Sequence, residues 1–426
     1  MKDTLSIVLA GGKLSTYPVL TDERTKSALP FLGIYRIIDF PLSNLVNSGA
    51  KTIGIIVQYL HSSLMDHVGL GQAWDLQGYR RYLKFLPPYV GTTGVQNYVG
   101  TADAIYKNRI FIIDFPAARD ILIVSGEQVY KYDFNNLLAE HRNRNADVTM
   151  LVRRYSKKDP FLNKYAYTRA DSKGRITSFQ EKPNKPSGDY MSIGIYVFKR
   201  AVLLELLQAD QANKTSHHIL ANDVLQRATE THNVYQFVTD APWFYLGDIN
   251  DYYMKHQDAL KSKPLITPDK WGIHTNLEDR NTGYRPPAHF FSRVSAKNNI
   301  VSAGCKIEGF VENSVLSPGV HIHKDARVTN SIIMHDAVIG KNAVVDKTII
   351  EKDTIIGEGT QIGVSGDNTP NKWYPDLLTN GLNLIGKGVN IPPNYILERN
   401  VVIFPKTMLV NYDKNIISGS CIGRET

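Results

Sequence analysis

Two glycines follow an apolar run near the start of the chain, in the stretch Leu9-Ala-Gly-Gly-Lys-Leu-Ser-Thr-Tyr-Pro18. Glycine lets a backbone approach its ligand closely, and free N–H groups after a strand are well suited to binding phosphate. This loop, however, carries Leu14 where a third small residue would be expected, and it contains no arginine. The stretch therefore resembles a phosphate-binding loop that lacks its third glycine and its positively charged arginine.

Alternating strands and helices must position this loop. We predict strands at residues 5–9, 52–57, 120–124, 148–152 and 192–198, and helices at 134–141 and 201–209. This alternation indicates an α/β fold with a mostly parallel sheet and helices on both faces. Ligands of such sheets bind at the carboxyl ends of the strands, which is where the loop after Leu9 lies.

A different periodicity governs the C-terminal part of the chain. From Cys305 onward, apolar residues recur in steps of five or six, and three steps sum to seventeen residues. Two columns result, formed by Val311, Val328, Val345 and Ile362 and by Leu316, Ile333 and Ile350. This hexapeptide pattern predicts a left-handed parallel β-helix, whose coils bury their apolar columns by stacking on one another.

A loop interrupts the repeat once, and the residue at which the repeat begins separates the C-terminal domain from the segment before it. It stops at a loop over residues 365–380 and resumes at Ile385, Ile391, Ile396 and Val402. We predict a Rossmann-like α/β domain at residues 1–262, a linker rich in Pro, Asn and Thr at 263–296, and the β-helix at 297–426.

The composition excludes several classes of protein. Apolar residues make up 42% and charged residues 21% of the chain, and no apolar run reaches the ~18 residues of a membrane span. Cys305 and Cys421 form no CxxC pair, so we expect no structural disulfide and a reducing, cytoplasmic location. The net charge of +8 has no long basic block behind it and suits small anionic ligands. We therefore expect neither nucleic acid nor a membrane as a partner.

An ordered set of motifs resembles the sugar-nucleotide pyrophosphorylases, and among them the glucose-1-phosphate adenylyltransferases (ADP-glucose pyrophosphorylases) of glycogen synthesis. The matching stretches are Leu9-Ala-Gly-Gly12, Arg24-Thr-Lys-Ser-Ala28, Arg36-Ile-Ile-Asp-Phe40, Leu42-Ser-Asn44, Asn47-Ser-Gly49, Gln58-Tyr59, Gly100-Thr-Ala-Asp-Ala104, Glu181-Lys-Pro183 and Ser192-Ile-Gly-Ile-Tyr196. The resemblance implies a nucleotidyltransferase domain in which glucose 1-phosphate attacks the α-phosphorus of ATP and pyrophosphate leaves. Such catalysis depends on positioning and charge neutralisation.

The resemblance also implies roles for individual residues. Nucleotide-binding positions are Ala10, Gly11, Gly12, Lys26, Gln58, Gly100, Thr101 and Asp103. Glu181, Lys182 and Ser192 match the sugar-phosphate side. Arg24 and Arg36 match positions that hold phosphorylated activators, with a role as structural ion-pair partners as the alternative. Lys182 has the alternative of a surface lysine in a turn.

The chain departs from the family at its catalytic and metal positions. The family loop reads Gly-Gly-x-Gly-x-Arg, whereas here Leu14 replaces the third glycine and Thr16 the arginine. Glu127 stands at the first metal aspartate and Tyr245 at the second, with Asp248 three residues further on. The loss of one preorganised charge contact typically costs ~10²–10³ in rate. The sequence therefore indicates a degenerate site, and we assign it no metal ligands.

This pattern resembles the GlgD-type subunit, a poorly catalytic or non-catalytic regulatory partner of an active GlgC-type paralogue. We expect a heterotetramer with that paralogue, no certain cofactor in this chain and Mg²⁺ only in the active partner. ATP, a sugar phosphate or a phosphorylated effector remain candidate ligands. The alternatives are an active adenylyltransferase with an atypical site, a related uridylyltransferase with an acetyltransferase β-helix, and a hexapeptide-repeat scaffold without a nucleotide role.

Overall fold

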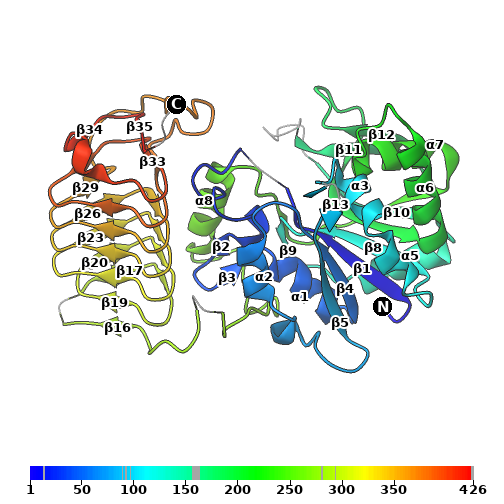
Figure 1. Ribbon diagram of the computed structural model, residues 1–426, viewed down its shortest axis with the longest axis horizontal. Coiled ribbons are helices and arrows are strands. Elements are labelled where there is room, and N and C mark those ends of the chain that lie inside the picture. The colour runs from blue at the N-terminus through cyan, green and yellow to red at the C-terminus, as the bar shows by residue number, and fades with distance from the viewer. Residues whose placement is uncertain are drawn as a thin grey trace.

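An α/β domain and a prism of short strands lie next to each other along the long axis of the molecule (Figure 1). The computed structural model describes residues 1–12, 15–88, 90–91, 94–95, 97–155, 164–279, 282–292 and 294–423. Within these residues, no helix is both long enough and apolar enough to cross a membrane.

A nine-stranded sheet forms the centre of the α/β domain. Its main path follows the order β12-β11-β13-β8-β1-β4-β5, and β10 pairs with both β13 and β14. The strands are β1 (Thr4–Leu9), β4 (Thr52–Ile56), β5 (Tyr82–Leu86), β8 (Asp120–Ser125), β10 (Val148–Arg154), β11 (Ala166–Ala170), β12 (Ile176–Glu181), β13 (Tyr190–Lys199) and β14 (Val234–Val238). The predicted strands are confirmed, with ends that differ by at most two residues.

The sheet is mixed, which differs from the mostly parallel sheet predicted. β8, β1, β4 and β5 run parallel to one another, whereas β13 runs antiparallel to β8, β10 and β11. An apolar run predicts a buried strand without its direction, because direction depends on the partner that the strand finds. The parallel half contains β1, so the loop after Leu9 still follows the carboxyl end of a central strand.

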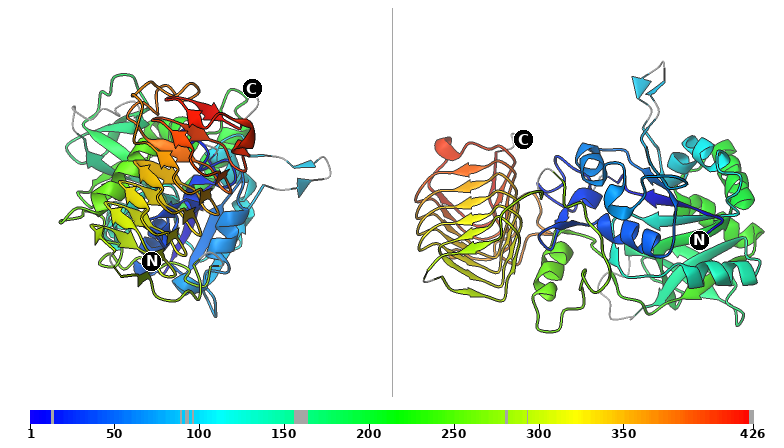
Figure 2. Two further views of the ribbon diagram at one scale, coloured as in Figure 1. Left: turned by 90° about the vertical axis from the view of Figure 1, so that its left-hand side faces the viewer. Right: turned by 90° about the horizontal axis from the view of Figure 1, so that it is seen from below.

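Helices cover both faces of this sheet (Figures 1 and 2). Ile7 and Val8 of β1 point to opposite faces and join separate apolar cores. One face packs α1 (Asp39–Asn47), α2 (Ser62–Val68) and α5 (Asn135–Asn143), and the other packs α3 (Thr101–Lys107), α4 (Arg109–Ile113), α6 (Arg200–Ala212), the π-helix η4 (Leu220–Leu225) and α7 (Gln226–Thr231). The two predicted helices correspond to α5 and α6, which confirms them.

Short elements complete this domain and connect it to the prism. They are the 3₁₀ turns η1 (Lys26–Ala28) and η2 (Gln72–Trp74), the strands β2 (Pro30–Phe31), β3 (Tyr35–Arg36), β6 (Val90–Gly91), β7 (Gly94–Val95), β9 (Val129–Tyr130) and β15 (Trp243–Phe244), and the helix α8 (Ile249–Ala259). The strands β9 and β15 pair with each other and bring residues 243–248 next to the segment that follows β8.

Three parallel sheets form the β-helix. The first sheet contains β16 (His289–Phe290), β19 (Lys306–Ile307), β22 (His321–Ile322), β25 (Val338–Ile339), β28 (Ile355–Ile356) and β31 (Asn390–Ile391). The second contains β17 (Ala296–Lys297), β20 (Phe310–Glu312), β23 (Arg327–Thr329), β26 (Val344–Asp346), β29 (Gln361–Ile362), β32 (Ile396–Leu397) and β34 (Asn415–Ile416). The third contains β18 (Ile300–Val301), β21 (Val315–Leu316), β24 (Ile332–Ile333), β27 (Thr348–Ile350), β30 (Asn383–Ile385), β33 (Val402–Ile403) and β35 (Cys421–Ile422), and the 3₁₀ turn η5 (Leu409–Asn411) lies before β34.

The seventeen-residue register of the β-helix is the one predicted. Val328 pairs with Val311 on one side and with Val345 on the other, and all three side chains are buried inside the prism. The repeated Asn-Ser pair occupies a corner of the coil, where Asn330 adopts a positive φ of 49° that asparagine tolerates better than most residues. The following Ser331 donates its hydroxyl to the Thr329 carbonyl oxygen, at 2.6 Å. The repeat therefore encodes both the interior and the corners.

The spacing after the loop at 365–380 differs from the prediction. Leu397 and Ile403 point into the prism and pair with Ile362 and Ile385, whereas Ile396 is exposed on the outside and Val402 packs against the α/β domain. The predicted inward residues Ile396 and Val402 are therefore wrong by one position. A slip of one residue turns a side chain to the other face, and neighbouring apolar residues leave the choice open in the sequence.

The third sheet of the β-helix packs against the α/β domain. Its outward residues Ile332, Ile349 and Leu384 join a core that includes Phe31 and Tyr252 of the other domain. The first strand of the prism, β16, lies within residues 263–296, the segment predicted as a linker. The domain limits 1–262, 263–296 and 297–426 stay a prediction.

Candidate functional site

A cavity of about 560 Å³ opens beyond the carboxyl ends of β1, β4 and β8. Many residues that the sequence assigned to nucleotide, sugar phosphate or the family's catalytic and metal positions line it, although they come from distant parts of the chain. These are Ala10, Gly11, Gly12, Gln58, Gly100, Thr101, Glu127, Glu181 and Lys182. The structure thus gathers the separate motifs around one space, which makes this cavity the candidate functional site.

Close contacts explain why glycine occupies several positions of these motifs. A Cβ on Gly12 would lie 3.0 Å from the Glu127 carboxylate, and one on Gly11 would lie 3.1 Å from the Gln58 backbone nitrogen. A Cβ on Gly100 would collide with the His218 carbonyl oxygen, which accepts a hydrogen bond from Ala102 N–H. The site therefore uses glycine for close backbone packing. Lys13 and Leu14, on which part of the sequence argument rests, lie outside the described residues.

A loosely paired lysine and carboxylate lie beside the glycine loop. Lys26 Nζ lies 4.0 Å from Glu127 Oε2, and the Lys26 side chain is buried. Burial lowers the pKa of Lys26, and the attraction of Glu127 and of Asp251 counters this only in part. Burial likewise raises the pKa of Glu127, against the opposing effects of Lys26 and a hydrogen bond from the Gly12 backbone. Both groups are therefore easier to neutralise than exposed groups of their kind.

Tyr245 fills the space over this lysine. Its ring centroid lies 5.7 Å from Lys26 Nζ and 4.9 Å from the ring centroid of Tyr165. Burial, helped by the Glu127 carboxylate, raises the pKa of Tyr245 to about 12, so the phenol keeps its proton at neutral pH. Thr16 Oγ1 donates to the Gly247 carbonyl oxygen at 3.0 Å and so ties the glycine loop to the same segment. A protonated phenol and a hydroxyl therefore stand where the family places charged groups.

The Asp248 carboxylate stabilises a helix and does not serve as a ligand-binding group of the cavity. Its carboxylate accepts hydrogen bonds from the N–H groups of Asn250 and Asp251, at 3.0 and 3.1 Å, and so caps the N-terminus of α8. Its second oxygen pairs with Lys164 Nζ at 2.9 Å. Because both oxygens are engaged, Asp248 does not substitute for the carboxylate that Tyr245 replaces.

The remaining predicted residues lie around the cavity without lining it. Asp103 accepts a hydrogen bond from Val99 N–H at 2.9 Å and pairs with Lys107 at 2.9 Å, which fixes the start of α3. Ser192 donates to the Tyr196 hydroxyl at 3.1 Å, and Tyr196 faces the cavity. These residues position the cavity wall.

Lys182 is an accessible cation of the site. Its side chain is 63% exposed, and its Nζ lies 3.9 Å from Glu181 Oε1. Its backbone φ is +46°, an unusual value for a lysine, which turns the chain at the end of β12. The exposed charge beside the cavity is available to an anionic ligand.

Comparison with known proteins identifies the family. A family model described as nucleotidyl transferase matches residues 5–262, and one described as GlmU-like, C-terminal hexapeptide matches residues 286–385. The glucose-1-phosphate adenylyltransferase of Thermomicrobium roseum is 37% identical over 95% of this chain and 94% of its own length. The chain belongs to the glucose-1-phosphate adenylyltransferase family.

Two further members of the family align along nearly the whole chain. The glucose-1-phosphate adenylyltransferase of Acetivibrio thermocellus is 34% identical over 95% of this chain and 93% of its own length. That of Thermosipho africanus is 36% identical over 99% of this chain and all of its own length. The likeness therefore includes both the α/β domain and the β-helix.

The residues present do not fit the magnesium site that the adenylyltransferase family implies. Such a site needs a carboxylate at each of two positions, and Mg²⁺ prefers strict octahedral coordination by oxygen. At the two positions that the resemblance assigns to metal ligands, Glu127 carries a carboxylate and Tyr245 a protonated phenol, while Asp248 caps α8. A phenol that keeps its proton is a poor ligand for Mg²⁺.

Arg24 and Arg36, assigned by the resemblance to effector binding, lie at the contact between the domains and do not line the cavity. Arg24 Nη2 lies 2.5 Å from Glu351 Oε2 of the β-helix, and both side chains are buried. Arg36 Nη2 lies 2.9 Å from Asp279 Oδ2 and also donates to the Ala28 carbonyl oxygen. These contacts favour the alternative of structural ion-pair partners.

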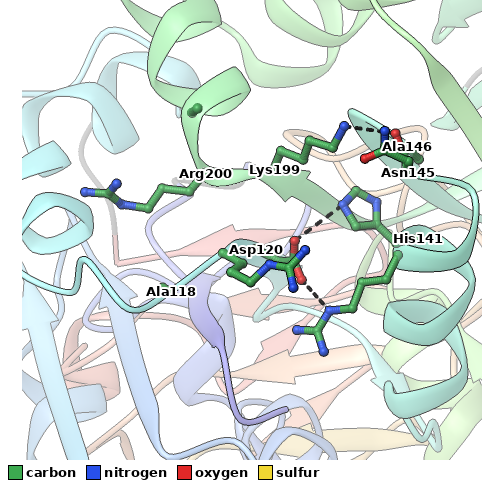
Figure 3. Close-up of a pocket in the computed structure, with 10 residues that line it drawn as sticks. Ala118, Asp120, His141, Asn145, Ala146, Lys199 and Arg200 are labelled. Atoms are coloured by element: carbon green, nitrogen blue, oxygen red, sulfur yellow. Dashed lines mark hydrogen bonds and ion pairs between the residues drawn. The ribbon is translucent and has the colours of Figure 1, made fainter.

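A second cavity, of about 330 Å³, lies at the start of β8 and therefore at the opposite edge of the sheet (Figure 3). Its polar groups lie close to one another: Figure 3 shows His141 directed at Asp120, at 3.7 Å, and Lys199 reaching Asn145, whose carbonyl oxygen accepts its hydrogen bond. Asp120 also accepts a hydrogen bond from Arg142 at 2.7 Å. None of the predicted site residues lines this cavity, so it is not the candidate site.

Sequence analysis does not single out several residues that shape the site. Tyr98, Tyr196 and Leu220 line the cavity, and Tyr165 and Lys164 hold the segment around Tyr245 and Asp248. The apolar and aromatic members look like ordinary core residues in the sequence. The π-helix η4, which follows the loop at 217–218, is an unusual local feature, and it carries Leu220 to the cavity wall.

Proposed function

We propose that this chain is the GlgD-type, regulatory subunit of an ADP-glucose pyrophosphorylase, with little turnover of its own. The relatives, named glucose-1-phosphate adenylyltransferases, support the reaction of the assembly, which joins ATP and glucose 1-phosphate into ADP-glucose and pyrophosphate. The partner is a catalytic GlgC-type paralogue, and the assembly is a heterotetramer. Mg²⁺ acts in the partner's site.

The packing of Tyr245 carries this proposal. This residue stands at the position that the resemblance assigns to a metal carboxylate, and its ring lies over Lys26, while Asp248 is held by Lys164 and the start of α8. An adenylyl transfer site must neutralise the charge that develops on the leaving pyrophosphate. Glu127, whose pKa is raised by burial and which has Tyr245 in place of a second metal carboxylate, is poorly suited to hold the cation that does this.

The cavity still offers groups for a phosphorylated ligand. Gly11 and Gly12 follow the carboxyl end of β1, and the exposed Lys182 brings a positive charge to the lining of the cavity. Binding without turnover would let ATP or a sugar phosphate act through this subunit on its partner. Arg24 and Arg36 are weaker candidates for an effector, because each already has a buried carboxylate partner.

The test is a comparison of pyrophosphate release by the purified chain, by a catalytic paralogue from the same source and by their mixture. With ATP, glucose 1-phosphate and Mg²⁺, we expect the chain alone to be at least ~10³-fold slower than the paralogue. Mixing should form a larger sedimenting species and raise the rate or its response to sugar phosphates. A rate near that of the paralogue selects the active-enzyme alternative. A mixture that changes neither sedimentation nor rate rejects the partnership.

Reversal of the substitutions tests the cause. The combined variant Leu14→Gly, Thr16→Arg, Glu127→Asp and Tyr245→Asp should gain measurable turnover, because it restores the family's charged groups. The control Tyr245→Phe retains the ring and should gain none. If the combined variant folds, binds ATP and remains as slow as the parent, these positions are not the cause of the low activity.

A further inference from the structure

Two histidines and a glutamate meet on the outer surface of the β-helix, on the first sheet. His321 and His323 are two residues apart on an extended segment, so both side chains face outward while Ile322 between them enters the core. Ile322 pairs with Ile307 of the preceding coil. Glu308, which follows Ile307, therefore lies beside His323.

The three side chains already have the spacing of metal ligands. His321 Nε2 lies 2.7 Å from Glu308 Oε1, and His323 Nδ1 lies 4.0 Å from the same oxygen. One ligand atom from each residue lies within 4.8 Å of the other two. Ligands about 2.1 Å from a tetrahedral Zn²⁺ are separated by roughly 3.4 Å, so small side-chain rotations would place all three around one ion.

The backbone beneath these side chains is held firmly. Glu308 N–H donates to the Ile322 carbonyl oxygen at 2.8 Å, and His323 N–H donates to Ile339 at 3.0 Å, as the coils stack. The rings of His321 and His323 lie 3.8 Å apart between centroids. In the part of the chain that the structure describes, no other three His, Cys, Asp or Glu side chains meet in this way. The fold thus preorganises the donors and leaves the outer side open to solvent.

We propose that Glu308, His321 and His323 form a binding site for a transition-metal ion of the Zn²⁺ class. Two imidazole nitrogens and one carboxylate oxygen are a donor set that Zn²⁺ accepts, with water in the fourth position. Mg²⁺ and Ca²⁺ prefer ligand sets made of oxygen and are disfavoured here. The ion would join two successive coils of the β-helix. This site is on a different domain from the nucleotide cavity, so it does not depend on the proposed function.

The direct test is a Zn²⁺ titration of the full chain, expressed without a histidine tag and stripped with EDTA. Calorimetry should find one ion per chain, and Co²⁺ at the same site should give the visible absorption of a tetrahedral complex. His321→Asn, His323→Asn and Glu308→Gln should each weaken binding at least ~100-fold. His289→Asn is the matched control, because His289 lies on the same sheet and pairs with Lys306 instead. This variant should bind normally, and excess Mg²⁺ should not compete.

A second measurement separates binding from folding defects. Saturating Zn²⁺ should raise the thermal midpoint of the parent and of His289→Asn, because a ligand that binds only the folded state stabilises it. The midpoint of metal-free Glu308→Gln should match that of the metal-free parent and should not respond to Zn²⁺. The proposal is overturned if the parent binds no Zn²⁺, or if binding survives all three ligand substitutions, which would place the ion elsewhere.

Discussion

Arg24 and Lys26 are separated by one residue, and both cations are buried, yet the two differ in how closely they pair with a carboxylate. Arg24 Nη2 lies 2.5 Å from Glu351 at the contact between the domains, whereas Lys26 Nζ lies 4.0 Å from Glu127 beside the cavity. A close buried pair leaves no charge free for a ligand. A loose pair, in which burial lowers the pKa of Lys26 and raises that of Glu127, can change its partners when a ligand arrives.

The difference extends to the surroundings of each cation. The domain contact holds a connected set of charges, since Arg36 pairs with Asp279 and Asp279 also binds His67 Nδ1 at 2.8 Å. Lys26, beside the cavity, lies instead against the aromatic rings of Tyr17 and Tyr245. This chain thus has connected, closely paired charges where its domains join, and a loosely paired lysine among aromatic rings beside the cavity.

The largest expected effect comes from breaking the pair at the domain contact. Arg24→Met should lower the free energy of unfolding by about 3–5 kcal/mol, because Glu351 remains buried without its cation. Urea denaturation followed by circular dichroism measures this loss. The double variant Arg24→Met with Glu351→Met should recover most of it. A loss below about 1 kcal/mol for the single variant would contradict the structural role.

An intermediate effect should appear in the dependence of stability on pH. Burial opposes protonation of His67, but Asp39 and Asp279 outweigh it and raise its pKa above 6.5. The contribution of His67 is therefore fully present below about pH 6.5 and is lost as pH rises through the folded-state pKa. His67→Gln should destabilise more at about pH 6 than at about pH 9, as measured by denaturation at both values.

His256 provides the opposite trend as a control. Burial lowers the pKa of this histidine to about 4, so it is neutral in the folded state, where Nε2 accepts a hydrogen bond from Leu32 N–H. Its contribution is present above about pH 6.5 and declines as pH falls. His256→Gln should therefore cost less at about pH 6 than at about pH 9. The same trend for both histidines would refute this account of the domain contact.

The smallest effect on stability is expected at the cavity. Lys26→Met should change the free energy of unfolding by no more than about 1 kcal/mol, because burial already disfavours its charge. The affinity for ATP or glucose 1-phosphate should nevertheless fall about tenfold, which corresponds to about 1.4 kcal/mol. Calorimetry measures both ligands, and Lys182→Met is the exposed comparison. A large loss of stability without a loss of affinity would make Lys26 a structural residue like Arg24.

Local patterns predicted the elements and the register but not every choice of face or direction. The seventeen-residue spacing is visible because each coil buries one residue at the same point, as Val328 does on Val311. The antiparallel course of β13 depends on which strand it meets, and the exchange of Ile396 for Leu397 depends on two adjacent apolar residues. Motif matching grouped the residues that line the cavity, but it also placed Arg24 and Arg36 among the ligand-binding positions, whereas their observed contacts are buried ion pairs.

The sequence by itself determined the repeat, the glycine loop and the replacement of family residues by Thr16 and Tyr245, because each of these is a property of residue type and spacing along the chain. Only the tertiary structure decided that Asp248 pairs with Lys164 and that Arg24 finds Glu351, which is 327 residues away. Such partners are chosen by how distant segments of the chain pack. A charge is neutralised by the group that burial brings next to it, whatever the distance between them in sequence.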